Sequence, residues 1–387
     1  MIETLFQEEL AQFHAEDLYR KLRVLQPVTS THALWNQKEL VLFCGNDYLG
    51  LSHHPRVIEA SKRAADRYGV GAGAARLISG TSEYHELLEL ELGRCKKKGK
   101  ALVFSAGYLA NLGVLTGLAD EKDVIVMDKL CHASLIDGAR LSGATLRVFP
   151  HKHYERCESI LKNAKGFRRR ILVSDTVFSM DGDLADFERL IDLKKRYDAM
   201  LVLDDAHGTG VFGIHGGGAL EDSGLESEVD VITGTLSKSL GCLGGFAAAS
   251  ESLVDYFINV SRPFIFATAL APHLCAAALE ALRLFEREPL LRHRLWQNIQ
   301  KTHAGLTQLG FQIGPVLSPI IPIVLGEEKQ ALRVCEALLE RGILIPAIRY
   351  PTVPKGKARL RLTVSASHED RDFNRLFREL KAIQDLL

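Results

Sequence analysis

The stretch Thr233-Gly234-Thr235-Leu236-Ser237-Lys238-Ser239-Leu240-Gly241 places one lysine among small and hydroxylated residues. No Asp, Glu or Arg occurs between Asp230 and Glu251. A lysine on a solvated face normally has charged neighbours, so this amine is expected to be partly buried with a depressed pKa. A neutral amine is a nucleophile, and the surrounding hydroxyl groups suit a phosphate. The stretch favours a lysine that holds a phosphorylated aldehyde cofactor as a Schiff base, and a lysine in a Gly-rich turn is the alternative.

The composition excludes several classes of partner. The chain has 387 residues, with 48 Lys plus Arg and 48 Asp plus Glu, so no net field attracts nucleic acid or an anionic membrane. Its seven cysteines are scattered without a CxxC pair, which predicts reduced thiols, a cytoplasmic location and no zinc or other metal. The first 22 residues lack the apolar core of a signal peptide, and no apolar run reaches the roughly 18 residues of a spanning helix.

Short apolar runs alternate with helical patterns through most of the chain. This alternation predicts βαβ units and a mostly parallel sheet, with ligands at the carboxyl ends of the strands. The runs occupy residues 101–104, 124–127, 146–149, 171–173, 200–203, 229–232 and 246–249.

The polar residues that end these runs are candidates for a site. Ser105-Ala106-Gly107-Tyr108 opens a helix whose free N–H groups suit a phosphate, although a plain small-residue helix start is the alternative. His132 follows another run and could stack on a planar ring, and Ser179 could hydrogen-bond a ring substituent. A structural histidine and a turn serine are the ordinary interpretations of these two residues.

The run 201–207, Leu-Val-Leu-Asp-Asp-Ala-His, delivers a carboxylate and an imidazole from the end of one buried strand. An aspartate at position 204 can keep a pyridine nitrogen protonated, which makes the ring an electron sink. The following residues 208–213 match GxGxxG, but they continue into Ile214-His215-Gly216-Gly217-Gly218 rather than into a helix. The dinucleotide interpretation therefore lacks its helix N-terminus, and a metal site lacks a third ligand close by.

The pattern predicts three parts: an N-terminal helix and arm at 1–50, a large domain at 51–288 and a small α+β domain at 289–387. The first helix is expected to extend to about residue 26. Within the last part, residues 349–354 (Arg-Tyr-Pro-Thr-Val-Pro) are expected to form an extended loop. Arg359 and Arg361 alternate with leucines, so either one could clamp a carboxylate, or both could lie on a solvated edge strand.

These motifs together resemble the α-oxoamine synthase family, pyridoxal-phosphate enzymes of fold type I, over nearly the whole chain. The implied fold is α/β, with a mostly parallel sheet flanked by helices and a smaller C-terminal α+β domain. The segments that carry the resemblance are 46–51 (NDYLGL), 105–108 (SAGY), 132–134 (HAS), 178–182 (FSMDG), 204–210 (DDAHGTG), 235–238 (TLSK) and 358–362 (ARLRL). The loop 347–354 is most like that of the family member in biotin synthesis.

The resemblance implies a role for each matched position. Lys238, His132 and Asp204 would be catalytic: the lysine forms the Schiff base, the histidine stacks on the ring and the aspartate pairs with its nitrogen. The remaining cofactor-binding positions would be Gly107, Tyr108, Ser179, His207, Thr235 and, reaching the neighbouring subunit, Thr268. Substrate would contact Arg20, Asn46, His132, Thr352 and Arg361.

The implied reaction is the decarboxylative condensation of L-alanine with pimeloyl-CoA or a pimeloyl carrier protein, in a homodimer. Sister reactions with glycine and acetyl-CoA, or with serine and a long acyl thioester, are alternatives, and a non-catalytic partner subunit is a further one. One segment departs from the family pattern: residues 71–76 read Gly-Ala-Gly-Ala-Ala-Arg where relatives often have serines. This departure puts the detailed acyl contacts in doubt, but not the cofactor site.

Overall fold

The computed structural model describes residues 2–386. Its internal contacts divide the chain into two units. Unit 1 comprises Met1–Asn46, Met180–Gly182 and Leu295–Leu387, and unit 2 comprises Asp47–Ser179 and Asp183–Arg294. The N-terminal segment thus shares its contacts with the C-terminal part, and one division falls inside helix α11 (Pro289–Gln308). The domain limits at residues 50 and 288 stay a prediction.

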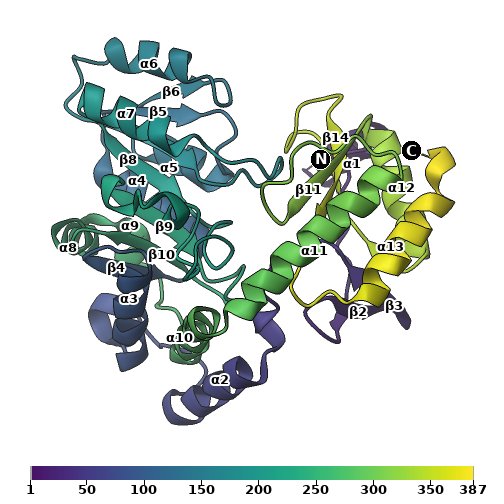
Figure 1. Ribbon diagram of the computed structural model, residues 1–387. Coiled ribbons are helices and arrows are strands. Elements are labelled where there is room, and N and C mark those ends of the chain that lie inside the picture. Colours follow the sequence, from purple (N-terminus) through teal and green to yellow (C-terminus); the bar gives the residue numbers. More distant parts are fainter. Residues whose placement is uncertain (1, 387) are drawn as a thin grey trace. The chain divides into compact units, whose positions relative to one another are not determined.

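Unit 2 is built on a seven-stranded sheet of order β4-β10-β9-β8-β7-β5-β6 (Figure 1). The pairs from β9 through to β6 are parallel, whereas β10 runs antiparallel to both β9 and β4. The predicted mostly parallel sheet is confirmed. Its strands are β4 (Lys100–Phe104), β5 (Val124–Asp128), β6 (Thr145–Phe149), β7 (Arg170–Asp175), β8 (Met200–Asp204), β9 (Val231–Thr235) and β10 (Gly245–Ala249).

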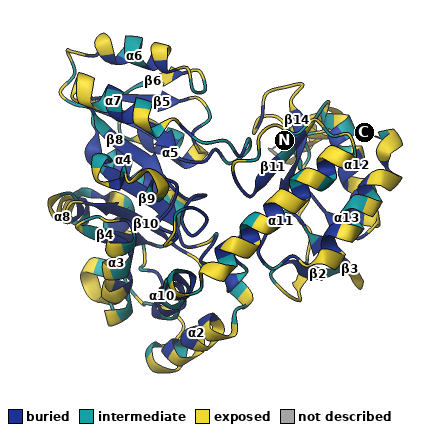
Figure 2. Cartoon of the chain, in the orientation of Figure 1, coloured by how far each residue is buried: buried dark blue, intermediate teal, exposed yellow. Residues whose placement is uncertain are grey.

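This sheet is apolar on both faces, which explains why its strands read as continuous hydrophobic runs. Along β5, Ile125 and Met127 join one buried cluster, whereas Val124 and Val126 join the cluster on the opposite face. The first cluster includes residues of α4, α5, α8 and α9, and the second includes residues of α6 and α7. The strands of this sheet are mostly dark blue, except for the edge strand β6, and the helices are yellow mainly where they turn to solvent (Figure 2).

The helices of unit 2 begin at residues suited to that position. Pro55 stands at the first position of α2, and the Asp186 side chain accepts a hydrogen bond from Arg189 N at the start of α7. The helices are α2 (Pro55–Tyr68), α3 (Glu83–Cys95), α4 (Gly107–Leu118), α5 (Ala133–Leu141), α6 (Tyr154–Lys162), α7 (Phe187–Tyr197), α8 (Glu251–Val260), α9 (Arg262–Ile265) and α10 (Pro272–Arg287). No helix within residues 2–386 is long and apolar enough to cross a membrane.

Unit 1 contains two small sheets, of order β1-β2-β3-β12 and β11-β14-β13. Their strands are β1 (Gln26–Pro27), β2 (His32–Trp35), β3 (Lys38–Leu42), β11 (Ile320–Gly326), β12 (Ile343–Leu344), β13 (Ala347–Ile348) and β14 (Ala358–Thr363). Its helices are α1 (Ile2–Ala15), α12 (Glu328–Glu340), α13 (Asp370–Ala382) and the larger part of α11.

Two local predictions in unit 1 were wrong. Helix α1 ends at Ala15 rather than near residue 26, because Asp17 takes a left-handed backbone conformation (φ 55°) that a helix cannot continue through. The segment 349–354 is not extended, because the N–H groups of Thr352 and Val353 both donate to the Arg349 carbonyl and close a turn.

Strand β14 lies in the middle of its sheet and carries two buried arginines. Arg359 Nη1 donates to Asp181 Oδ1 at 2.6 Å, and Arg361 Nη1 donates to Asn46 Oδ1 at 3.2 Å. The solvated-edge interpretation was therefore wrong for both. Arg359 forms an ion pair with a carboxylate of this chain, whereas Arg361 donates to the neutral amide of Asn46.

A buried histidine packs the core of unit 1. The His368 ring stacks on Phe43 with centroids 4.2 Å apart, its Nδ1 accepts from Ser365 N at 2.9 Å, and its Nε2 donates to the Leu42 carbonyl at 3.1 Å. These bonds require the neutral ring. Burial lowers the pKa of His368 from 6.5 to about 4.

Replacing His368 by Gln should therefore change how stability depends on pH. Between pH 6.5 and about 4 the unfolded chain binds a proton at this ring that the folded chain excludes, so the free energy of unfolding falls as the pH falls. The contribution is about 1.4 kcal/mol per pH unit. The urea midpoint of the variant should decline less steeply with falling pH than that of the parent. A parallel decline would contradict the buried neutral ring, and His14→Gln on exposed α1 is the matched control.

Candidate functional site

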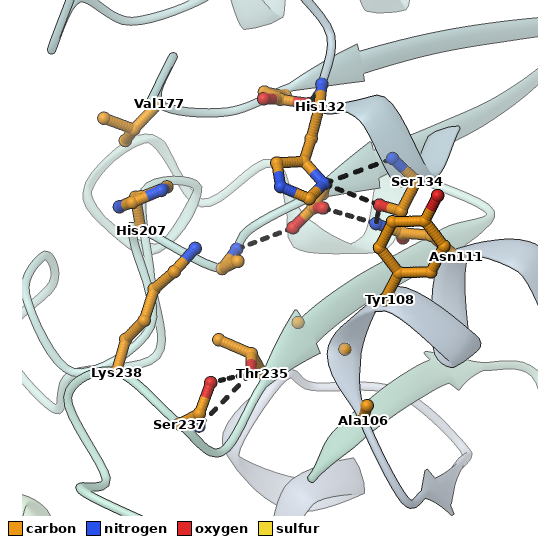
Figure 3. A pocket seen from close by; sticks show the side chains of 15 residues that line it. Ala106, Tyr108, Asn111, His132, Ser134, Val177, His207, Thr235, Ser237 and Lys238 are labelled. Carbon is orange, nitrogen blue, oxygen red and sulfur yellow. Dashed lines mark hydrogen bonds between the residues drawn. The ribbon is translucent and has the colours of Figure 1, made fainter. Parts of the chain in front are cut away.

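A cavity of about 250 Å³ opens at the carboxyl ends of the parallel strands in unit 2. Figure 3 shows Lys238, His207, His132 and Thr235 arranged around it. This is the edge where an α/β sheet is expected to bind its ligand. The lining residues are Ala106, Gly107, Tyr108, Asn111, His132, Ser134, Asp175, Val177, Asp204, Ala206, His207, Gly234, Thr235, Ser237 and Lys238.

Asp204 is the last residue of β8, and its carboxylate is fixed from two sides. Oδ2 accepts from Asn111 Nδ2 at 2.6 Å, and Oδ1 accepts from Ala206 N at 2.9 Å. Asn111 is itself oriented, because its Oδ1 accepts from the Thr233 hydroxyl at 2.6 Å. The carboxylate is 7% exposed and cannot turn away without breaking these bonds.

A second carboxyl group, that of Asp175, lies at the end of β7. Its Oδ1 accepts from His132 N at 3.2 Å. Burial, followed by the charge of Asp204, raises the pKa of Asp175 well above its ordinary value. The protonated form of Asp175 is therefore favoured, so the two carboxyl groups are not equivalent.

His132 precedes α5 and is held in one tautomer. Its Nδ1 accepts from Ser134 N at 3.3 Å and lies 2.7 Å from Ser134 Oγ, so the ring proton belongs on Nε2. Burial lowers the pKa of His132, against the opposing effect of Asp204. A neutral, fixed imidazole is suited to lie on a planar ring, and this role of His132 stays a prediction.

Lys238 lies in the hairpin loop that joins β9 to the antiparallel β10. Three backbone bonds close this loop: Leu236 N to Gly244 O at 3.0 Å, Cys242 N to Leu236 O at 2.9 Å, and Gly241 N to Lys238 O at 2.8 Å. Gly241 has φ 66°, and a Cβ there would lie 2.2 Å from Ser52 N. The loop thus holds the lysine on a tightly packed backbone with its amine toward the cavity (Figure 3).

The opposite end of the cavity offers hydrogen-bond donors. Helix α4 begins at Gly107 without a side-chain cap, so its first N–H groups are available to a ligand. Thr235 Oγ1 lies 2.7 Å from Ser237 Oγ, and a Cβ at position 107 would lie 3.0 Å from the Thr235 Cβ. Because position 107 is a glycine, the N-terminus of α4 can lie close to the hydroxyl groups of Thr235 and Ser237.

His207 lies in the turn that follows β8. Its Nδ1 is 2.7 Å from the Tyr48 hydroxyl, and both side chains are buried. Residues 208–218 form turns rather than a helix, so the GxGxxG match has none of the geometry of a dinucleotide site.

The residues around the cavity fit the expected pyridoxal phosphate. An amine is available for the aldehyde, an oriented carboxylate for the ring nitrogen and a neutral imidazole for the ring face. The N-terminus of α4 with Thr235 offers N–H and O–H donors suited to a phosphate. This set of groups comes from four separate segments of unit 2, since Thr235 and Lys238 share one.

The structure brings together seven of the predicted cofactor residues and leaves others apart. The seven that line the cavity are Gly107, Tyr108, His132, Asp204, His207, Thr235 and Lys238. Ser179 and Thr268 belong to unit 2 but are not among the lining residues. The predicted substrate residues Arg20, Asn46, Thr352 and Arg361 belong to unit 1.

Sequence reasoning missed Asn111, Ser134, Asp175 and Tyr48. Asn111 had a usable signal, because it is the one amide in the otherwise apolar segment 107–115 and stands one turn after Gly107. Asp175 ends β7 just as Asp204 ends β8, but the apolar run 171–173 stops two residues before Asp175.

Comparisons with known proteins agree over nearly the full chain. Residues 38–380 match the family model described as aminotransferase class I and II. The 8-amino-7-oxononanoate synthase of Methylococcus capsulatus is 45% identical over 372 residues, covering 96% of each chain. The enzyme of that name from Geobacter metallireducens is 42% identical over 380 residues, covering 98% of this chain and 97% of its own.

Among solved structures, the serine palmitoyltransferase of S. paucimobilis with bound PLP superposes with a TM-score of 0.94. It is 30% identical, and the match covers 98% of this chain and 97% of that chain. The predicted fold class, type I with a mostly parallel sheet and a smaller C-terminal part, is confirmed. The chain therefore belongs to the aminotransferase class I and II family and, within it, to the α-oxoamine synthases that include 8-amino-7-oxononanoate synthase.

Proposed function

We propose that this chain condenses L-alanine with a pimeloyl thioester to give 8-amino-7-oxononanoate, carbon dioxide and free thiol, a step of biotin biosynthesis. One observation carries the proposal: Lys238, Asp204 and His132 converge on a single cavity. The curated relatives with that activity in their names are 39–46% identical over almost the whole chain, which supports this member of the family over its sisters.

The cofactor is pyridoxal 5'-phosphate. When bound, it supplies an electron sink for the carbanion that forms at the amino-acid Cα. Lys238 would hold its aldehyde, Asp204 would keep its ring nitrogen protonated and His132 would pack on its face. Thr235 and the N–H groups of Gly107 and Tyr108 would bind the phosphate. His207, with Ser179, would hydrogen-bond the phenolic oxygen.

Lys238 also moves the proton. The Lys238 amine would be the base that removes the alanine Cα proton and the acid that later returns a proton to the product carbon. Asn111 contributes indirectly, because its amide keeps the Asp204 carboxylate aimed at one place in the cavity.

The substrates are assigned to residues of unit 1. Arg361 is buried beside Asn46 and is the proposed partner of the alanine carboxylate, and Arg20 and Thr352 face the acyl donor. The alanine carbon attacks the thioester carbonyl, the thiol leaves, and the resulting β-keto acid loses carbon dioxide. A proton then replaces the carboxylate, which gives an amino-ketone and balances the reaction.

A serine palmitoyltransferase activity is the second candidate. The structural match to such an enzyme, with a TM-score of 0.94, favours it, although the identity is only 30%. It would use the same cofactor chemistry with serine and a long acyl thioester. The two functions therefore differ in substrate choice alone.

The proposed active unit is a homodimer in the cytoplasm. Phe266 and Ile78 are 68% and 80% exposed, and the Ala75–Thr268 bridge joins the segments that carry them, which supports a subunit contact near Thr268. The location rests on the seven cysteines, all of which are free thiols, and cell fractionation tests it.

Two variants should separate the roles of lysine and aspartate. Lys238→Ala should lose both turnover and the visible absorbance that pyridoxal phosphate gives when bound to a lysine. Asp204→Asn should keep the absorbance but exchange the alanine Cα proton at least about a hundredfold more slowly, because an amide cannot hold the ring nitrogen protonated. Deuterium wash-out measures the exchange, with Asp186→Asn on α7 as the control. Exchange at the parent rate in Asp204→Asn would refute its assigned role.

A substrate competition should decide between the two candidate functions. One enzyme sample is offered L-alanine, glycine and L-serine, each with pimeloyl, acetyl and palmitoyl thioesters, and thiol release is measured alongside the amino-ketone formed. Alanine with the pimeloyl donor should give the highest kcat/KM. If serine with the palmitoyl donor wins, the second candidate function replaces the first. Glycine with acetyl-CoA would instead indicate the 2-amino-3-oxobutyrate ligase reaction.

Complementation should reveal whether subunits share sites. Lys238→Ala should be inactive alone and Thr268→Ala only weakly active, because the proposed role of Thr268 is to bind the phosphate in the neighbouring subunit. Mixed and refolded together, they should regain about a quarter of the parent activity if subunits pair at random, since one site in four then carries neither substitution. Sedimentation of an active monomer would exclude the proposal.

A further inference from the structure

Lys96 is a fully buried cation that lies outside the cavity lining. It caps the C-terminus of α3 and is 1% exposed. Its Nζ donates to Asp205 Oδ2 at 2.7 Å, to Thr209 Oγ1 at 2.6 Å and to the Gly217 carbonyl at 2.7 Å. All three ammonium protons therefore have acceptors, and all three acceptors belong to the segment that follows β8.

Asp205 links Lys96 to residues next to the cavity wall. Its Oδ1 accepts from the Thr176 hydroxyl at 2.6 Å and from Ala219 N at 3.2 Å. Thr176 stands between Asp175 and Val177, which both line the cavity. The carboxylate of Asp205 thus joins the end of β7 to the end of β8.

The same network closes the turn that carries His207. The Asp205 carbonyl accepts from Gly208 N at 3.1 Å, from Thr209 N at 3.0 Å and from the Thr209 hydroxyl at 2.9 Å. Because Thr209 also accepts from Lys96, both ends of the turn are tied to one ammonium group.

The glycines around this ion pair make its close packing possible. A Cβ at Gly208 would lie 2.0 Å from Asp205 Oδ1, and one at Gly218 would lie 1.9 Å from Asp205 Oδ2 and 2.8 Å from Lys96 Nζ. Gly218 also has φ 116°, a conformation that residues with a side chain rarely adopt. The Gly-rich stretch that mimics a dinucleotide fingerprint is therefore shaped to enclose a carboxylate and an ammonium group.

Stability alone does not explain this arrangement. A buried ion pair is often no more stabilising than apolar residues of the same volume, whereas a fully bonded pair specifies one geometry. Here that geometry is the path of residues 205–209. Asp204 immediately precedes these residues and His207 lies among them, so the pair sets where two cavity-lining side chains emerge from the backbone.

We propose that Lys96 is a positioning residue for the cofactor site: through Asp205 and Thr209 it fixes the turn that presents Asp204 and His207 to the cavity. The inference rests on the proposed function, because Asp204 and His207 are positioned to contact pyridoxal phosphate. Lys96 touches neither substrate nor cofactor, and its effect passes through the backbone of residues 205–209.

The test uses the whole chain and three variants. Lys96→Met removes the ammonium but keeps an unbranched stem, and Lys96→Met/Asp205→Asn removes both charges so that no carboxylate is left buried without its cation. Lys98→Met is the matched control, because Lys98 is also partly buried near the end of α3 but donates to the Val229 carbonyl instead of to the turn. The readouts are the pyridoxal phosphate dissociation constant of the apoprotein, its urea midpoint and the alanine Cα–H exchange rate.

A positioning role predicts that stability and cofactor binding respond differently. The double variant should recover much of the urea midpoint lost in Lys96→Met, yet both should bind pyridoxal phosphate about 10- to 100-fold more weakly than Lys98→Met, the range found when residues that orient ligands are removed. Exchange should slow in both variants at saturating cofactor.

Three outcomes would overturn the inference. The first is a dissociation constant equal to that of Lys98→Met in either variant, and the second is a double variant that recovers binding together with stability. In the third, neither variant folds, so the pair is a requirement of folding only. If the unmodified chain does not bind pyridoxal phosphate, the proposed function fails instead, and the two failures are thereby distinguished.

Discussion

The hydrogen bond from Asn111 to the Asp204 carboxylate connects the fold to its chemistry. It joins helix α4 to the end of strand β8. The hydroxyl of Thr233 on the neighbouring strand β9 in turn fixes the Asn111 amide. An acidic side chain at this buried place is tolerated only because each of its oxygens has a donor. The sheet must therefore keep β8, β9 and α4 in register for the carboxylate to keep both donors and its direction.

Much of this arrangement could be predicted from the sequence, because the signals are strong where strands are buried on both faces. The apolar runs located all seven strands of the large sheet to within a few residues, and the polar residues after them pointed to the correct edge. Asp204 was found because it directly follows such a run, and His132 and Lys238 because they lie in the polar segments that come after theirs. Ionisable side chains are unusual so close to buried strands, and for this reason the three residues stood out in the sequence.

Other features could not be predicted, for physical reasons that differ. Nothing in the run 246–249 indicates that β10 reverses direction, because alanines packed on both faces look alike in parallel and antiparallel strands. Tyr48 is brought to His207 by a long-range contact that leaves no periodic trace in the sequence. The extent of α1 was overestimated because its apolar residues remain exposed, so periodicity there does not mark a buried face.

The hairpin that carries Lys238 has a consequence for how this protein tolerates change. Most loops at the carboxyl edge of such a sheet lead into a helix and can vary in length, but this one returns directly into the antiparallel β10. Its backbone hydrogen bonds and the close approach of Gly241 to Ser52 fix the length of the loop. An inserted or deleted residue would shift the register of β10 between two neighbouring strands, and its side chains would exchange faces. Loop grafting or recombination in this protein should therefore treat residues 236–244 as part of the sheet rather than as a connection.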